Sequence, residues 1–296
     1  MLGVVNLDKP VGPTSHDMVG LMRRLTGTRR IGHAGTLDPL ASGVLPILVG
    51  AATRFSEELT GGRKRYDAVI RLGQTSATDD AEGPITSVDA ALPPEGAITD
   101  ALAEFVGTFE QRPPAFSARK VAGRTAYRAA RAGEPIDLPP RTVTVDSIDV
   151  LEMHSGEGWL DVRVDLRCAP GTYVRSIARD LGERLGSGGH LYALRRTEAA
   201  GLRADEAFTP DRLEALAAEG RLAEAVRPVG ALLPLPAVSL GSEAAWRFVH
   251  GAAQSVDDGG DGRVKVFDQA GDLIGIGSLT SSELRPEKVV PQDAEG

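Results

Sequence analysis

A single aspartate stands in a stretch of the chain that is otherwise small, apolar or turn-forming. The stretch RIGHAGTLDPLASG contains one carboxylate, Asp38, and places His33 five residues before it. Loops often carry Asp because its side chain accepts hydrogen bonds from nearby backbone amides, so Asp38 is compatible with a simple turn. A carboxylate on a rigid loop is equally compatible with a nucleophile or a general acid or base. The stretch alone does not decide between these two interpretations.

Three other side chains complete the polar set around Asp38. Tyr66 and Tyr173 offer rings that stack and hydroxyls that relay protons, and Arg175 offers a guanidinium that pairs with a carboxylate. Each also has an ordinary structural explanation, since Tyr66 suits the inside of a sheet and Arg175 suits the surface of a helix. Composition and spacing leave all of them undecided.

Several common catalytic motifs are missing from the sequence. It has no Walker A pattern, no G-x-G-x-x-G between a strand and a helix, and no G-x-S-x-G elbow. No Cys and His cluster has metal-ligand spacing, so we expect neither a metal nor a cofactor. The acid-rich stretch ATDDAEG could hold a metal, or supply Asp79 or Asp80 to a glycosidase. A solvated loop is the simpler interpretation of that stretch.

Composition points to a cytoplasmic enzyme or binding protein. The 296 residues are 42% hydrophobic and 25% charged, with no apolar run near the roughly 20 residues that span a bilayer. The start MLGVVNLDKP lacks the basic region and cleavage site of a signal peptide. One cysteine, Cys168, excludes an internal disulfide and fits a reducing compartment. We therefore expect a cytoplasmic location and no membrane partner.

The net charge of −8 conceals a basic region. Residues 201–296 hold 9 basic and 16 acidic side chains, whereas residues 1–200 are nearly balanced with 24 and 25. The segment QRPPAFSARKVAGRTAYRAARAG, residues 111–133, has six basic residues and no acidic one. Two further basic clusters, GGRKRY and LMRRLTGTRR, make a phosphate-binding groove a reasonable expectation.

Apolar patterning predicts a sheet with flanking helices. Strands and helices follow one another without a strict βαβ rhythm, which favours an α+β fold with a mixed, mostly antiparallel sheet. Pro46 suggests an edge or a bulge in its strand, and residues 262–279 suggest a hairpin that turns at Gln269–Asp272. The expected strands are residues 3–10, 43–50, 64–73, 141–153, 159–169 and 190–202.

Capping residues predict where the helices begin and end. Thr14 with Asp17 resembles a capping box, Thr99 and Thr209 are candidate N-caps, and Gly27 ends the first helix. The expected helices are residues 14–27, 97–109, 126–131, 171–186 and 209–220.

Prolines near residue 232 predict a domain boundary. The stretch RPVGALLPLPAV holds three prolines, and the chain after it has short, strand-like apolar segments. We therefore expect a larger domain at 1–232 and a small β-rich module at 233–296.

Four stretches together resemble the TruB family of tRNA pseudouridine synthases. They are NLDKPVGPTSHD, GHAGTLDPLASGVLPI, KRYDAVIRLGQTSATDDAEG and GTYVRSIARDLGERLGSGGHLYALRR, and they match in order and spacing from residue 3 to about residue 200. The resemblance implies the pseudouridine synthase fold with a PUA-like C-terminal module and a thumb-like insertion near 111–141. It implies isomerisation of the uridine at position 55 in the T loop of tRNA, by a monomer that needs no cofactor and no protein partner.

The resemblance also assigns roles to single residues. It implies that Asp38 is the nucleophile with no second acid beside it, that Arg175 pairs with it, and that Tyr66 stacks on the uracil and relays a proton. It leaves open whether the aspartate attacks C1′ or C6, or drives loss of the C2′ proton to give a glycal. Base flipping is required because a stacked nucleotide hides C1′, and His33 resembles the residue that fills the gap. The remaining implied substrate-site residues are Lys9, Pro10, Lys64, Tyr173, Leu194, Arg119, Lys120, Arg124 and Arg128.

Two departures from the family pattern concern RNA binding. The insertion reads SARK where an apolar residue is usual before the lysine, so either Arg119 adds a phosphate contact or Lys120 is shifted. The C-terminal module is acidic, so we do not assign it strong RNA affinity. Two alternative functions remain: a non-catalytic protein that binds or folds tRNA, and a glycoside hydrolase that uses Asp38 with Asp79 or Asp80.

Overall fold

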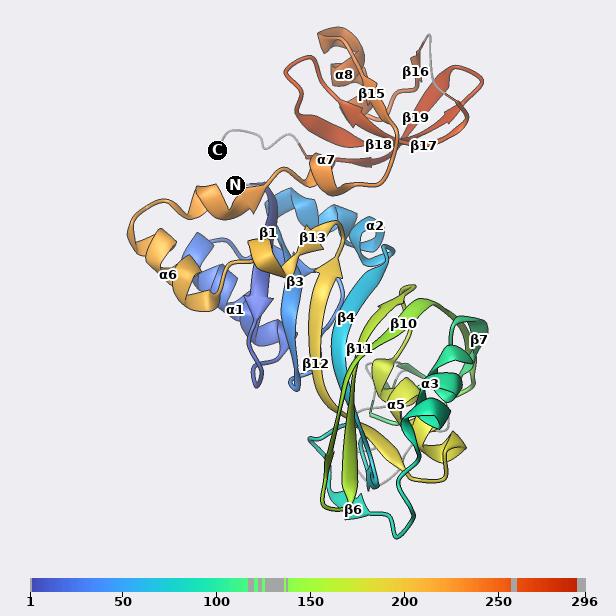
Figure 1. The fold of residues 1–296 in the computed structure, drawn as a ribbon. Coiled ribbons are helices and arrows are strands. Elements are labelled where there is room, and N and C mark those ends of the chain that lie inside the picture. Colours follow the sequence, from blue (N-terminus) through green and yellow to red (C-terminus); the bar gives the residue numbers. More distant parts are fainter. Residues whose placement is uncertain are drawn as a thin grey trace.

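The computed structural model describes residues 2–116, 120–121, 124–125, 136, 138–256 and 260–291. Its largest element is one central sheet (Figure 1). The strands of that sheet are β1 (Gly3–Lys9), β2 (Ile31–His33), β3 (Ala41–Val49), β4 (Lys64–Leu72), β7 (Gly107–Gln111), β10 (Arg141–Gly156), β11 (Trp159–Cys168), β12 (Gly189–Ala199), β13 (Leu202–Arg203) and β14 (Val226–Arg227).

The order of these strands is β14–β1–β3–β12–β4–β11–β10–β7, with β2 attached to β3 and β13 attached to β12. Within the described residues, β3 and β12 run parallel and the other pairs of this sheet are antiparallel. The predicted α+β fold with a mixed, mostly antiparallel sheet is thus confirmed. The predicted position of Pro46 at an edge is wrong, because β3 is an interior strand. Pro46 lies where the partner of β3 changes from β12, at residues 41–43, to β2, at residues 47–49.

Helices cover the sheet in two groups (Figure 1). Two helices, α1 (Ser15–Thr26) and α6 (Pro210–Ala218), lie against the half with β1 and β3, whereas α3 (Glu95–Ala103) and α5 (Val174–Arg184) lie against the half with β4, β10 and β12. The shorter helices are α2 (Ser56–Thr60), α7 (Val229–Leu232) and α8 (Ser242–Val249). No helix in the described ranges is long and apolar enough to cross a membrane.

Local sequence signals explain most of the helix ends. Thr14 and Asp17 form the predicted capping box, and Gly27 ends α1 in the left-handed conformation with φ 68°. Thr209 caps α6 as predicted. The prediction of Thr99 as an N-cap is wrong, because α3 begins after Pro94 and the Thr99 hydroxyl donates back to a carbonyl inside the helix. That helix also ends early, since residues 107–111 form strand β7.

The two faces of the central sheet differ in chemistry. Along β4, Tyr66, Ala68 and Ile70 are buried against the helices, while the alternate side chains face outward. The outward face carries cross-strand ion pairs: Arg163–Asp67 at 2.6 Å, together with Arg71–Asp161 and Arg65–Asp165. The active residues must therefore be sought on the buried face or at its rim.

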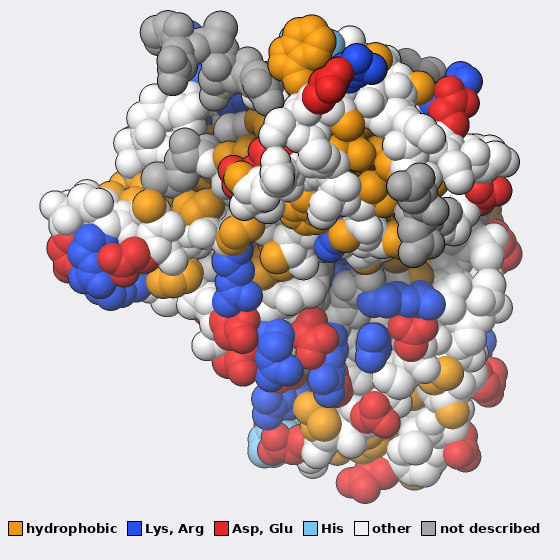
Figure 2. Space-filling view, turned by 90° about the horizontal axis from the view of Figure 1, so that it is seen from above, with side chains coloured by type: hydrophobic (Ala, Val, Ile, Leu, Met, Phe, Trp, Pro, Cys, Tyr) orange, Lys and Arg blue, Asp and Glu red, His pale blue; other side chains and the backbone are white. Residues whose placement is uncertain are grey.

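The C-terminal part forms a separate five-stranded sheet that packs on the larger one (Figure 1). Ile276 shares an apolar cluster with Leu48 and Phe55 of the larger part, and Arg263 pairs with Glu58 of α2 at 2.8 Å. From this end of the molecule, basic and acidic side chains intermingle on the surface (Figure 2). The strands of this sheet are β15 (Ala237–Ser239), β16 (Gln254–Ser255), β17 (Gly262–Phe267), β18 (Leu273–Thr280) and β19 (Glu283–Val289).

Two short hairpins lie outside both sheets. One pairs β5 (Gln74–Ser76) with β6 (Ile85–Ser87), and the stretch ATDDAEG, predicted as a loop, lies between these two strands. The other pairs β8 (Lys120–Val121) with β9 (Arg124–Thr125) in the predicted thumb-like insertion. The turn between β17 and β18 closes by a hydrogen bond from Asp268 N to the carbonyl of Asp272, which confirms the predicted hairpin.

Candidate active site

Three neighbouring strands bring the predicted residues together. The Asp38 loop leads directly into β3, and across the sheet Gly43 of β3, Arg196 of β12 and Tyr66 of β4 lie opposite one another. Gly43 has φ 100°, and a Cβ atom there would lie 2.2 Å from the carbonyl oxygen of Arg196. Only glycine therefore lets β3 approach β12 at the base of the loop.

The expected pair of Asp38 and Arg175 is present. Arg175 Nη2 lies 3.0 Å from Asp38 Oδ2. Its side chain is 7% exposed, whereas that of Asp38 is 42% exposed. Burial raises the pKa of the Asp38 carboxyl, and the charge of Arg175 opposes that rise. Asp38 is thus a carboxylate that pairs with Arg175 through one oxygen and remains partly exposed to solvent.

The sequence analysis considered Asp80 only as a solvated residue or a glycosidase acid, so its contact with Arg175 is the first feature of this site that sequence reasoning missed. Its side chain is 2% exposed, and its Oδ2 lies 3.2 Å from Arg175 Nη1, so the guanidinium joins two carboxylates. Its other oxygen accepts hydrogen bonds from the Thr78 hydroxyl and from the backbone N–H of Glu82. The predictions of a solvated loop and of no acid beside Asp38 are therefore both wrong.

The glycosidase alternative is not supported, although Asp80 contacts the same guanidinium as Asp38. Asp80 shares a guanidinium with Asp38, but its carboxylate is buried and both of its oxygens are occupied. Asp79 pairs instead with Arg179 at 2.9 Å. A glycosidase needs its second carboxylate to reach water or a sugar, and neither acid is free to do so.

Arg196 is the second residue that sequence reasoning missed. Its side chain is wholly buried and donates to the carbonyls of Val44 (2.7 Å), Gly35 (3.0 Å) and Thr36 (3.4 Å). It is also the direct cross-strand partner of Tyr66, whose side chain is buried as well. Burial along β12 does not alternate, so the sequence carries no local signal that Arg196 faces inward and Arg195 outward.

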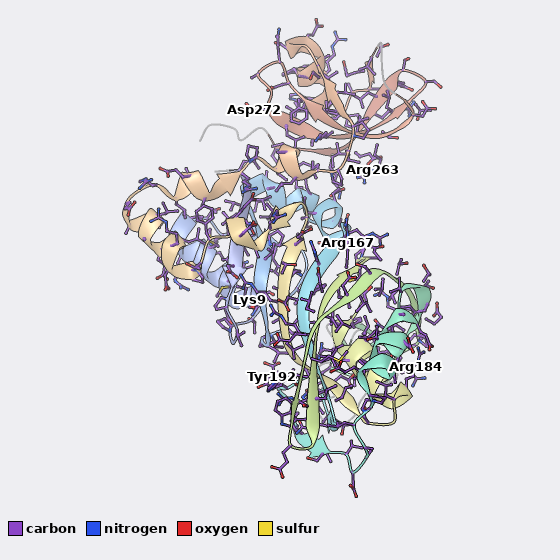
Figure 3. All side chains as sticks on the ribbon, viewed as in Figure 1. Lys9, Arg167, Arg184, Tyr192, Arg263 and Asp272 are labelled. Atoms are coloured by element: carbon purple, nitrogen blue, oxygen red, sulfur yellow. The ribbon has the colours of Figure 1, made fainter. Side chains whose placement is uncertain are left out.

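The N-terminal segment holds the other side of the Asp38 loop. Lys9, at the end of β1 (Figure 3), is fully buried and donates to the carbonyls of Pro10 (2.8 Å), Pro13 (2.7 Å) and Pro39 (3.4 Å). Burial lowers the pKa of Lys9 to about 8. The hydroxyl of Ser15 bonds to both backbone groups of Leu37, at 2.8 and 2.9 Å. Lys9 and Pro10 thus lie where support of the loop was expected.

Tyr66 and His33 are both held in neutral form. Burial raises the pKa of the Tyr66 hydroxyl, with the charge of Arg196 opposing the rise. Burial, then the charge of Arg196, lowers the pKa of the His33 ring. The Nδ1 atom of His33 is buried and has no hydrogen-bond partner among the described residues. A neutral, flat and unsatisfied ring is suited to stacking on a base.

Tyr173 and Leu194 each lie two residues before one of the two buried arginines, Arg175 and Arg196. Tyr173 precedes α5, and the buried amide of Gln111 bonds to its backbone N–H (2.9 Å) and carbonyl (3.1 Å). Leu194 is half-buried on β12, next to Ala41 of β3. Their roles in lining a uracil pocket stay predictions.

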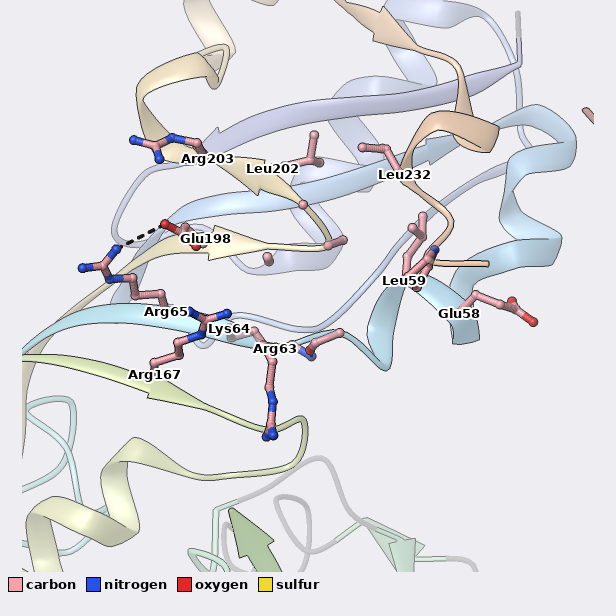
Figure 4. Close-up of a pocket in the computed structure, with 15 residues that line it drawn as sticks. Glu58, Leu59, Arg63, Lys64, Arg65, Arg167, Glu198, Leu202, Arg203 and Leu232 are labelled. Atoms are coloured by element: carbon pink, nitrogen blue, oxygen red, sulfur yellow. Dashed lines mark hydrogen bonds and ion pairs between the residues drawn. The ribbon is translucent and has the colours of Figure 1, made fainter. Parts of the chain in front are cut away.

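Lys64 lies deeper than a phosphate contact would require. It is 7% exposed and donates to the carbonyls of Thr60 (2.5 Å) and Gly62 (2.8 Å), and burial lowers its pKa to about 8. It also lines a pocket of about 380 Å³ among Arg63, Arg65 and further side chains (Figure 4). Neither Asp38 nor Arg175 lines that pocket. A substrate contact for Lys64 stays a prediction.

The basic insertion is only partly described. Arg119, Arg128 and the predicted helix at 126–131 lie outside the described residues, as do the side chains of Lys120 and Arg124. Their roles stay predictions. In the described part of the chain, no group of three or more His, Cys, Asp or Glu side chains could hold a metal ion.

Family models match nearly the whole chain. One described as "TruB family pseudouridylate synthase (N terminal domain)" matches residues 23–174. Two others, "tRNA pseudouridylate synthase B C-terminal domain" and "Pseudouridine synthase II TruB, C-terminal", match residues 175–234 and 236–290. The resemblance seen in the sequence motifs therefore extends into the C-terminal module.

Curated relatives and solved structures agree with these models. The tRNA pseudouridine synthase B of Ralstonia nicotianae is 42% identical over 296 residues and covers 97% of this chain and 94% of its own. That of Corynebacterium aurimucosum is 49% identical over 213 residues, 72% of each chain. A chain from the structure of an H/ACA RNP bound to a substrate RNA containing 2′-deoxyuridine aligns with a TM-score of 0.74 and 28% identity, covering 98% of this chain and 86% of its own. The protein therefore belongs to the TruB family of pseudouridylate synthases, enzymes that isomerise uridine to pseudouridine.

Proposed function

We propose that the protein converts the uridine at position 55 in the T loop of tRNA to pseudouridine, with Asp38 as the nucleophile. The observation that carries this proposal is a half-exposed carboxylate paired at 3.0 Å with a buried guanidinium. The names of the curated relatives, tRNA pseudouridine synthase B, support tRNA as the substrate.

Asp38 suits an attack on a flipped nucleotide. Arg175 aims one carboxylate oxygen and neutralises its charge, while the rest of the side chain is partly exposed to solvent. Asp38 then either bonds to C1′ or C6, or drives loss of the C2′ proton to give a glycal. The N1–C1′ bond breaks, the held uracil rotates, and C5 bonds to C1′ and loses its proton.

The surrounding residues support the same reaction. Tyr66 stacks on the uracil and its hydroxyl relays the C5 proton, while Tyr173 and Leu194 line the pocket. His33 fills the gap that the flipped nucleotide leaves, because its neutral ring replaces the lost stacking. The basic residues of the insertion, including Arg119, Lys120 and Arg124, bind T-arm phosphates.

The proposal also covers domain organisation, oligomeric state and cellular location. Residues 1–232 form the catalytic domain with an insertion near 111–141, and residues 233–296 form a PUA-like module. The protein acts as a monomer, without a cofactor or protein partner, in the cytoplasm where its tRNA is found.

The decisive substitution is Asp38→Asn, which keeps the shape of the side chain and removes its charge. We expect pseudouridine formation on a T-arm transcript to fall by at least about 10⁴-fold, because the nucleophile itself is lost. Mass mapping of pseudouridine in treated tRNA locates the product, and binding of the same transcript should stay within about threefold of wild type.

A second substitution, Asp67→Asn, is the control for Asp38→Asn. Asp67→Asn removes a carboxylate from the outward face of the sheet, where it pairs with Arg163, and should leave catalysis unchanged. Wild-type rates in Asp38→Asn would contradict the nucleophile assignment and favour a protein that only binds or folds tRNA. Pseudouridine at another position would contradict the T-loop assignment alone.

A further inference from the structure

Arg196 binds backbone carbonyls of residues that come before and after Asp38 in the chain. Two of its three carbonyl partners, Gly35 and Thr36, come just before Asp38 in the chain, and the third, Val44, lies in the next strand, β3. A single planar guanidinium therefore holds the beginning and the end of the loop at once. Lysine could not reproduce this arrangement, because an ammonium is a point donor on a flexible stem.

The charge of Arg196 has no carboxylate partner among the described residues. Its hydrogen bonds go to three backbone carbonyls. A buried cation without a counter-ion is costly, which is why buried arginines are normally paired with acids. A purely structural clamp would be less costly with a neutral amide side chain, so the retained charge suggests a role in the reaction.

Tyr66 is the group on which that charge acts. Arg196 and Tyr66 are direct cross-strand partners, and both side chains are buried. A guanidinium has five N–H donors and no acceptor, so in a hydrogen bond between the two the Tyr66 oxygen is the acceptor and the Tyr66 O–H proton is left for another acceptor. The charge of Arg196 also opposes the rise that burial causes in the pKa of Tyr66.

We propose that Arg196 is a positioning residue that ties the Asp38 loop to the Tyr66 hydroxyl, so that one buried guanidinium sets the nucleophile and the proton relay relative to each other. This inference rests on the proposed function, since it assumes that Asp38 attacks and Tyr66 relays the proton. It assigns a role to Arg196 alone and adds no step to the reaction.

The first test is Arg196→Lys, with Arg195→Lys as the matched control. Arg195 is the preceding residue on β12 but faces outward and pairs with Asp8 at 2.8 Å. We expect Arg196→Lys to lower kcat on the order of 10²-fold, because misplacement of a reacting group by about 1 Å has an effect of that size. The Kd for a T-arm transcript should change less than threefold, and Arg195→Lys should keep wild-type kcat.

A double-mutant cycle distinguishes positioning from a merely structural role. If Arg196 and Tyr66 act as a unit, Arg196→Lys lowers kcat much less in a Tyr66→Phe background than in wild type. Equal losses in both backgrounds, with rates normalised to folded protein, would overturn the link to Tyr66. A kcat of Arg196→Lys within twofold of wild type would overturn the inference entirely.

A neutron structure of the wild-type protein tests the same point without any substitution, and it decides the matter if Arg196→Lys does not fold. The inference requires deuterons on Arg196 directed at the Tyr66 oxygen and the Tyr66 deuteron directed elsewhere. A Tyr66 oxygen that accepts nothing from Arg196 would overturn it. If the wild-type protein makes no pseudouridine, the proposed function is wrong. The neutron structure then still shows whether Arg196 donates a hydrogen bond to the Tyr66 oxygen.

Discussion

Arg175 and Arg196 are both buried in the active site, yet their surroundings differ in kind. Arg175 joins two carboxylates, Asp38 at 3.0 Å and Asp80 at 3.2 Å. Arg196 binds three backbone carbonyls, two in the loop that carries Asp38 and one in strand β3 that follows it. One arginine therefore controls the charge of the nucleophile, and the other controls its position. Substitutions of the two arginines should lower activity for different reasons. The pH dependence of kcat/KM is the measurement that distinguishes them.

Among substitutions of the residues that surround Asp38, the largest effect is expected from Arg175→Gln. Its loss removes the charge that opposes the raised pKa of Asp38, so that pKa rises further. The reactive carboxylate is then lost at a higher pH, and the acid limb of kcat/KM moves upward. We expect the rate at neutral pH to fall roughly 10³-fold, since a positioned charge beside the reacting group is removed.

Two companion variants make the Arg175 result interpretable. Arg175→Lys keeps the charge but cannot reach both carboxylates, so the rate should fall while the acid limb stays near that of wild type. Arg184→Gln, at the exposed end of the same helix, should change neither. If Arg175→Gln left the acid limb in place, control of charge would not be what distinguishes the two arginines.

Sequence reasoning identified the residue types that can react but not those that hold them. Asp38, Tyr66 and Arg175 were selected because few side chains supply a nucleophile, a proton relay and a counter-ion. Asp80 was assigned to solvent because paired acids in a polar stretch usually are solvated. Its burial depends on Arg175, which lies 95 residues further along the chain. Burial created by so distant a partner leaves no local signal.

The same limit applies to Arg196. In sequence, Arg195 and Arg196 are two equal arginines on one strand, and only the orientation of that strand decides which faces inward. Elements with strong local signals were predicted well: the capping box of α1 and the alternation of β4 both appear as expected. The end of α3 was missed because Gly107, with φ 112°, starts strand β7 where apolar spacing still resembled a helix.

Asp80→Asn is expected to lower kcat less than Arg175→Gln does. It is expected to shift the acid limb of kcat/KM in the opposite direction. The charge of Asp80 raises the pKa of Asp38, so its removal lowers that pKa and moves the acid limb of kcat/KM to lower pH. We expect a loss of roughly 10- to 100-fold in kcat, because Arg175 loses one of its two carboxylate anchors. The profile should be measured beside that of Arg175→Gln, and shifts in the same direction would contradict the two-carboxylate account. Asp149→Asn, which removes an exposed carboxylate of β10, provides the matched control for loss of an acidic charge.

The smallest effect is expected from Ser15→Ala, which loosens the loop at Leu37. The Ser15 hydroxyl satisfies both the N–H and the carbonyl of Leu37, the residue before Asp38. Its removal leaves two buried backbone groups without a partner, so stability to urea should fall by roughly 1 to 3 kcal/mol. The loop keeps its Arg196 clamp, however, so kcat should fall only a few-fold and the pH profile should not move.

Thr26→Ala, at the other end of the same helix, is the control for Ser15→Ala, since the Thr26 hydroxyl bonds only within the turn that ends α1. It should change stability slightly and kcat not at all. If Ser15→Ala instead lowered kcat as far as Arg196→Lys does, the loop would be held equally from both sides. The difference between the two buried arginines would then lie in what Arg175 does to the charge of Asp38, and Arg196 would be one of several equivalent supports.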